Sequence, residues 1–143
     1  MKKTILAAVM ICFIAAICTS CTRSNLPTPI QTPSQKILGK WTMQSAAGHY
    51  IVQGDERRDT TWFTSADYFK FNADSTLNIL ADSIAYNGKW HIQNNKLFIS
   101  GTNYMDWYPS GFELPVLTSH KLQIYDKDST SNAYLQQTLT LVR

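Results

Sequence analysis

Cysteine is missing from this chain after position 21, because its three cysteines are Cys12, Cys18 and Cys21. A globular part built from the later residues therefore has no disulfide, no thiolate zinc site and no cysteine nucleophile. We expect its stability to come from a packed core.

The chain also lacks an excess of either charge once its first 20 residues are set aside. Lys2 and Lys3 lie in that segment, and the remaining residues include 11 basic and 10 acidic side chains. Binding to nucleic acid depends on a basic field, so we expect no nucleic-acid partner.

Catalytic motifs are absent as well. The sequence contains no Gly-x-Ser-x-Gly, no His-Glu-x-x-His and no phosphate-binding loop. The three histidines, which show no paired spacing, are His49, His91 and His120. We expect no metal site, no cofactor and no enzymatic activity. Two acidic residues that lie close together can form a catalytic pair, and the candidates here are Asp67, Asp106, Asp126 and Asp128. We expect all four to be solvated.

The start of the chain holds an apolar run from Ile5 to Ile17, preceded by two lysines and followed by Cys18-Thr19-Ser20-Cys21. This order resembles a bacterial lipoprotein signal. The run is shorter than the roughly 20 residues that cross a bilayer. We expect residues 1–20 to be a signal peptide and Cys21 to carry fatty-acyl chains such as palmitate, with ordinary secretion as the alternative.

Three prolines follow within a stretch rich in Ser, Thr, Asn and Gln: Pro27, Pro29 and Pro33. This composition predicts an extended tether over residues 21–35. The remaining residues, 36–143, have the length of one domain.

Apolar and polar residues alternate over short stretches after residue 35, which predicts an all-β domain. The first expected strands are Ile37–Gln44 and His49–Gln53, followed by a charged loop over Asp55–Asp59. The last is Tyr134–Val142. We predict an eight-stranded up-and-down antiparallel barrel, with a β-sandwich as the alternative.

Four motifs stand in order along these strands: Leu38-Gly39-Lys40-Trp41, Tyr68-Phe69-Lys70-Phe71, Asn87-Gly88-Lys89-Trp90 and Leu139-Thr140-Leu141-Val142-Arg143. This order resembles the small lipocalin-like lipoproteins of Bacteroidetes over nearly the whole domain. The resemblance implies that Gly39 and Trp41 lie in the first strand of a lipocalin-like barrel and that Arg143 crosses the Trp41 ring at its closed end. Alternation places both Trp41 and Arg143 on the inward side.

An eight-stranded barrel is wide enough to be filled by its own side chains or to hold one small ligand. The candidate ligand-binding residues are the inward-facing Phe69, Phe71 and Trp90 and the aromatic residues of segment 104–112, namely Tyr104, Trp107, Tyr108 and Phe112. The alternative is that the aromatic loop contacts a glycan or an envelope protein.

Four Asp-Ser or Asp-Thr pairs match the acceptor pattern for O-glycosylation in exported Bacteroidetes proteins, and their candidate hydroxyls are Thr60, Ser75, Ser83 and Ser129. Turn formation explains the same pairs. We therefore expect a lipid-anchored cell-envelope protein that binds a small apolar or amphipathic molecule. Because the residue after Cys21 is threonine and not aspartate, the resemblance favours the outer membrane, facing the periplasm.

Overall fold

The computed structural model describes residues 29–105, 110–129 and 133–143. The chain divides into two compact units, Met1–Ile30 and Gln31–Arg143. The expected signal peptide and the lipidation of Cys21 lie outside the described residues, as do Trp107 and Tyr108. The second unit begins at Gln31, ahead of the boundary expected at residue 36.

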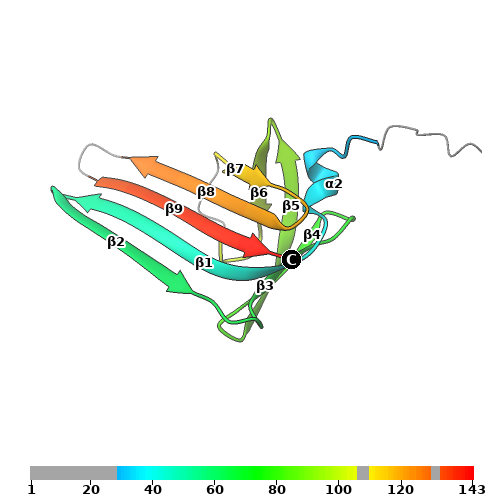
Figure 1. Cartoon of the computed structure of the whole chain (residues 1–143), viewed down its shortest axis with the longest axis horizontal. Coiled ribbons are helices and arrows are strands. Elements are labelled where there is room, and N and C mark those ends of the chain that lie inside the picture. The colour runs from blue at the N-terminus through cyan, green and yellow to red at the C-terminus, as the bar shows by residue number, and fades with distance from the viewer. Residues whose placement is uncertain (1–28, 106–109, 130–132) are drawn as a thin grey trace, which may run out of the picture. The chain divides into compact units, whose positions relative to one another are not determined.

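The described residues form one short helix and nine strands (Figure 1). They are α2 (Pro33–Ile37), β1 (Gly39–Val52), β2 (Asp55–Trp62), β3 (Tyr68–Phe71), β4 (Thr76–Ala81), β5 (Ile84–Gln93), β6 (Lys96–Ser100), β7 (Phe112–Leu117), β8 (Lys121–Ser129) and β9 (Ala133–Val142).

Eight of the strands close an antiparallel barrel in the order β1-β3-β4-β5-β6-β7-β8-β9, because β1 also pairs with β9. The predicted all-β barrel is confirmed, and the sandwich alternative is wrong. The ninth strand, β2, is an addition that pairs with the outer part of β1 through Ser45–Val52. The inner part of β1, Gly39–Thr42, pairs with β3 instead.

The prediction was wrong about the stretch between the first strand and β3. The two expected strands, Ile37–Gln44 and His49–Gln53, fall mostly within one strand, β1, and the expected charged loop over Asp55–Asp59 is the first five residues of β2. Every residue of β2 is exposed, so no burial pattern marks it as a strand. Its pairing is set by a two-residue turn at Gln53 and Gly54, whose φ angles of 53° and 90° suit a tight hairpin.

The end of the expected tether is helical. Thr32 caps α2 by accepting a hydrogen bond from the Gln35 backbone amide, and the Gln35 side chain accepts one from the Thr32 amide at 2.9 Å. Pro33 suits the first helical position because it needs no amide partner there. Ile37 ends this helix and is fully buried, so it does not begin the first strand as expected.

Large apolar side chains fill most of the barrel interior. The largest that are fully buried are Trp41, Phe69, Phe71, Phe112, Ile37, Met43, Leu77, Ile79, Leu97, Leu122 and Leu141. Aromatic rings pack against one another in this core. The rings of Phe71 and Trp90, for example, meet edge to face with their centroids 5.5 Å apart. The interior that the described residues enclose is therefore mostly filled, and a ligand pocket can only border this cluster.

Candidate functional site

Gly39, Trp41 and Arg143, which the resemblance to lipocalin-like proteins places at the closed end of the barrel, lie together in the structure. The guanidinium carbon of Arg143 lies 3.8 Å from the centroid of the Trp41 ring. Trp41 is fully buried, and its indole nitrogen donates a hydrogen bond to the carbonyl of Ile37 at 2.6 Å. Burial lowers the pKa of Arg143, which stays protonated because a guanidinium loses its proton only at very high pH.

Arg143 also binds the chain that enters the barrel. Its Nη2 atom donates to the carbonyls of Lys36 at 3.1 Å and Ile37 at 3.4 Å, and also to that of Leu38. Gly39 has a φ of +107°, a conformation that residues with a side chain rarely adopt, and this turns the chain from α2 into β1. These three residues thus form a structural contact that joins α2, β1 and the end of β9.

Three of the predicted ligand-binding residues belong to the solid core. Phe69, Phe71 and Trp90 are 0%, 1% and 6% exposed and pack against other core side chains. The indole nitrogen of Trp90 donates to the carbonyl of Asn72 at 3.1 Å, so its polar atom is also occupied. None of the three lines the pocket described next.

A pocket of about 270 Å³ lies where β2, β1, β9 and β8 run side by side and extend past the shorter strands (Figure 1). Its lining residues are Ala46, Ala47, Gly48, Tyr50, Asp59, Thr61, Phe63, Tyr104, Met105, Phe112, Ile124, Asp126, Gln137, Thr138 and Leu139. Two of the predicted ligand-binding aromatics, Tyr104 and Phe112, are therefore placed at this pocket.

The inner wall of the pocket is apolar and aromatic. Phe112 and Ile124 are each 2% exposed, and Leu139 packs against the same core. The Tyr104 ring contacts that of Tyr86, with centroids 5.0 Å apart. Burial, followed by the nearby charge of Asp82, raises the pKa of the Tyr104 phenol. This wall offers an apolar surface on which an apolar group can pack.

A row of residues across four strands supplies polar groups to the same pocket. Asp59 of β2 pairs with Gly48 of β1, Gly48 pairs with Gln137 of β9, and Gln137 pairs with Asp126 of β8. With strands about 4.8 Å apart, the two aspartates at the ends of the row stand roughly 14 Å apart along the sheet. A carboxylate therefore lines each side of the pocket.

Gly48 shapes the middle of this row. A Cβ atom there would overlap the ring of Tyr50 and would lie 2.6 Å from Oδ1 of Asp59. The missing side chain thus lets the Tyr50 ring lie across β1 beside Asp59. Gln137 holds the ring in place, because its Nε2 donates to the Tyr50 hydroxyl at 3.2 Å.

Two of the acids expected to be solvated are buried, namely Asp67 at 4% exposure and Asp126 at 8%. Asp67 accepts hydrogen bonds from the Thr64 hydroxyl at 2.7 Å, the Thr64 amide at 2.9 Å and the Asp82 amide at 3.0 Å. The bond from the Thr64 side chain contributes most to holding the pKa of Asp67 below its usual range. Asp128 is exposed as expected, and Asp106 lies outside the described residues.

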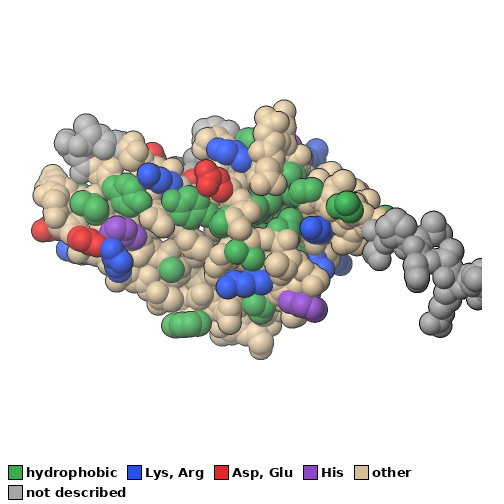
Figure 2. All heavy atoms as spheres, turned by 45° about the horizontal axis from the view of Figure 1, so that its top comes forward, with side chains coloured by type: hydrophobic (Ala, Val, Ile, Leu, Met, Phe, Trp, Pro, Cys, Tyr) green, Lys and Arg blue, Asp and Glu red, His purple; other side chains and the backbone are tan. Residues whose placement is uncertain are grey.

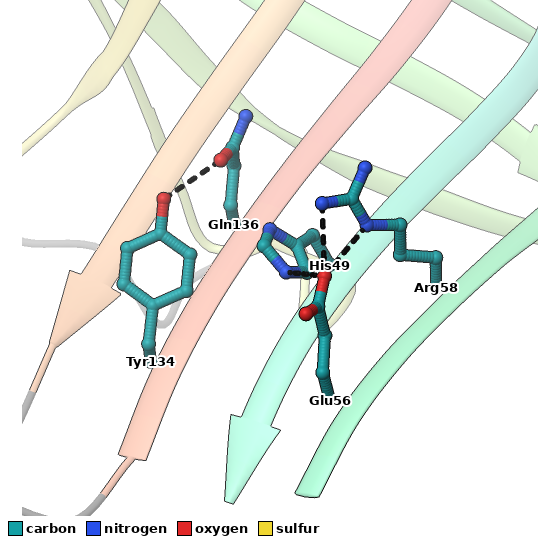
Figure 3. Close-up of polar contacts among 5 residues, drawn as sticks. All are labelled: His49, Glu56, Arg58, Tyr134 and Gln136. Atoms are coloured by element: carbon teal, nitrogen blue, oxygen red, sulfur yellow. Dashed lines mark hydrogen bonds and ion pairs between the residues drawn. The ribbon is translucent and has the colours of Figure 1, made fainter. Parts of the chain in front are cut away.

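The opposite face of the extended sheet carries a polar network (Figure 3). Glu56 Oε1 lies 3.0 Å from His49 Nε2 and 2.8 Å from Arg58 Nη2. Hydrogen bonding and charge from Arg58 lower the pKa of Glu56. His49 also meets the Tyr134 ring edge to face at 5.5 Å. The network therefore joins β2, β1 and β9. In the space-filling view of Figure 2, a histidine lies beside acidic and basic side chains at the left.

The four candidate glycosylation residues are all exposed. Ser75 and Ser83 occupy tight turns, each with a φ of 66°. Thr60 lies within β2 instead of in a turn, and Ser129 ends β8. Exposure is a requirement for an acceptor hydroxyl, and all four meet it.

The described residues contain no group of three or more His, Cys, Asp or Glu side chains that could hold a metal ion. No helix in the described part of the chain has the length and apolar character to cross a membrane. No model of a known protein family matches the chain. A comparison with curated proteins likewise finds no match.

The sequence did not point to the polar side of the pocket. Asp59 stood in an expected loop, Asp126 was expected to be solvated, and no sequence pattern marks Gly48 or Tyr50 as residues of a site. A signal for the turn before β2 did exist in Gly54, because glycine readily adopts the positive φ that a tight hairpin turn requires. A bulge in β1, where its register against β9 shifts between Met43 and Ser45, has no such signal in the sequence.

Proposed function

We propose that this protein is a lipid-anchored cell-envelope protein whose barrel binds a small amphipathic molecule in the pocket between β1, β2, β8 and β9. The observation that carries the proposal is a pocket of about 270 Å³ with an apolar inner wall and a polar row of residues at its side. Ligand sites of this kind are concave and mainly apolar, with a few polar groups that orient the ligand.

The size of the pocket limits the ligand. Typical sites for drug-sized molecules measure about 300 to 1,000 Å³, so a pocket at the lower end suits a compact molecule and not a whole phospholipid. The solid core supports the same limit, since Trp41, Phe69 and Leu122 are fully buried and leave no room deeper in the barrel.

The positions of Tyr104 and Phe112 favour ligand binding over the alternative of an aromatic loop that contacts a glycan or protein. Both residues line the pocket, and Phe112 is only 2% exposed. A residue that contributes contact area to a partner must be exposed on the free protein.

The anchor and the location rest on the sequence. Cys21 follows an apolar run and small residues, and the motifs along the strands resemble lipocalin-like lipoproteins of Bacteroidetes. The closed barrel is compatible with that resemblance. We propose a lipidated Cys21 in the outer membrane with the barrel in the periplasm.

Filling the pocket tests the proposed function. The change Ala46→Phe places a large ring in the pocket, and Ala85→Phe is the matched control, because Ala85 is an exposed residue of β5 outside the pocket. We expect the uncharged dye N-phenyl-1-naphthylamine to bind the wild type and the control with one-to-one stoichiometry. The Ala46→Phe variant should no longer bind the dye, while its circular dichroism spectrum stays the same as that of the wild type.

Absence of dye binding to the wild type, together with no displacement by envelope lipid extracts, would contradict a ligand-binding barrel. Equal binding by both variants would place the dye outside this pocket.

A further inference from the structure

The charged side chains among the described lining residues of the pocket are all acidic. Asp59 and Asp126 are the carboxylic acids of that lining, and none of its described residues is Lys, Arg or His. Asp126 is 92% buried, so its carboxylate acts in a medium that screens charge less than water does. An anionic head group brought into this pocket meets repulsion from both sides.

Aromatic side chains line the pocket as well. Tyr50, Phe63, Tyr104 and Phe112 all contribute to it. The faces of such rings carry partial negative charge and attract cations, most strongly where water is excluded. Carboxylates together with aromatic rings and no basic group are the surroundings that an ammonium ion prefers.

From these observations we infer that the ligand is a cationic amphiphile, a compact apolar group that carries a protonated amine. This inference rests on the proposed function and names the chemical class of its ligand. The apolar group contacts Phe112, Ile124 and Leu139, and the ammonium group forms charge-assisted hydrogen bonds with Asp126. Asp59, at the other end of the row, adds to the negative field of the mouth.

The row geometry explains why the two carboxylates act on one pocket. Gly48 and Gln137 stand between them in the row, and the Tyr50 ring takes the space that a side chain at position 48 would occupy. Tyr50 lies over Gly48, where its hydroxyl is fixed by Gln137. A ligand ammonium entering between the aspartates therefore meets an aromatic ring on the way.

Three probes with the same eight-carbon chain test the charge of the head group: octylamine, 1-octanol and octanoate. Each is titrated against the full chain carrying Cys21→Ser with N-phenyl-1-naphthylamine bound, and displacement of the dye is measured by fluorescence. We expect octylamine to displace the dye at concentrations at least about tenfold lower than 1-octanol, and octanoate to be the weakest.

Variants of nearly equal shape assign the effect to the pocket carboxylates. Asp126→Asn should lower the affinity for octylamine by about tenfold to a hundredfold, because a charge-assisted hydrogen bond is removed. The affinity for 1-octanol should stay within about twofold of its wild-type value. Asp59→Asn should have a smaller effect. Asp128→Asn is the control, because it removes the same charge from an exposed residue of β8 outside the pocket lining.

Each result decides a separate question. If the dye binds and 1-octanol or octanoate displaces it as well as octylamine does, the cationic ligand is refuted while ligand binding stands. The inference is also refuted if the preference for octylamine survives in both Asp126→Asn and Asp59→Asn. If neither the dye nor any probe binds, both the proposed function and this inference are refuted.

Discussion

Removing the contact between Trp41 and Arg143 should destabilise the barrel by more than the loss of either side chain's packing alone. The Arg143 guanidinium carbon lies 3.8 Å from the centroid of the indole ring, well inside the range of about 6 Å for a cation–π interaction. Trp41 is fully buried, so truncation to alanine should cost about 3 to 5 kcal/mol. Replacing Arg143 by methionine should cost about 1 to 3 kcal/mol, because hydrogen bonds to Lys36, Ile37 and Leu38 are lost.

A double-mutant cycle isolates the contact itself. Trp41→Leu is the better variant for the cycle, because it removes the ring and keeps apolar volume, so the protein stays folded. The free energies of unfolding of wild type, Trp41→Leu, Arg143→Met and the double variant are measured by urea denaturation with far-ultraviolet circular dichroism. We expect a coupling of about 0.5 to 2 kcal/mol.

Arg143→Lys is a useful fourth comparison, since lysine keeps the charge and loses the planar group that stacks on the ring and donates to several carbonyls. Its stability should lie between those of the wild type and Arg143→Met. Single effects that add to within about 0.3 to 0.5 kcal/mol would refute the reasoning, because additivity at that level means the two side chains do not interact.

Four further outcomes are expected. Cys21→Ser should move the protein from the membrane to the soluble fraction, whereas Cys18→Ser should stay membrane-bound; equal membrane retention of both variants would reject lipidation at Cys21. Gly48→Ala should keep the fold but weaken dye binding several-fold, because the new methyl group displaces the ring of Tyr50, and unchanged affinity would show that this ring does not shape the pocket. The intact mass of protein from its native host should exceed that of the lipidated polypeptide by sugar increments, and an unmodified mass would leave the four Asp-Ser and Asp-Thr sites as turns. Because the pKa of Asp67 is lower in the folded protein, its ionised carboxylate contributes stability that is fully present above the unfolded pKa of about 3.9 and is lost as the pH falls through the lower folded value. The melting temperature should therefore fall more between about pH 5 and 3 in the wild type than in Asp67→Asn. Parallel curves of melting temperature against pH would contradict this.

Alternation of apolar and polar residues was enough to predict the barrel and much of its core. Strands such as Thr76–Ala81 bury every second residue, as the sequence pattern indicates. The inward sides of Trp41 and of Leu141 follow from the same two-residue period, because neighbouring side chains of a strand point to opposite faces. The Asn94-Asn95 pair likewise indicates a tight turn between two strands, because asparagine tolerates the positive φ that both residues adopt.

The pocket could not be predicted in this way because a bulge interrupts the period of β1. Its register against β9 shifts between Met43 and Ser45. Before this shift the odd-numbered residues of β1 point inward. After it the even-numbered residues Ala46, Gly48 and Tyr50 point inward instead. Counting from Trp41 places these residues on the wrong face, so Gly48 and Tyr50 could not be recognised as lining residues from sequence.

What the sequence by itself determined is therefore the periodic part of the protein: an all-β barrel, the set of apolar side chains on its inward face and an inward-facing Trp41. The tertiary structure decided where the interior stays open, because that depends on strand length and register. Only the pairing of β2, β1, β9 and β8 brings Asp59 and Asp126 to one pocket, since these residues are 67 positions apart in the chain and neither has a local pattern that marks it. Local periodicity specifies which face a side chain takes, whereas pairing between distant strands specifies which side chains meet.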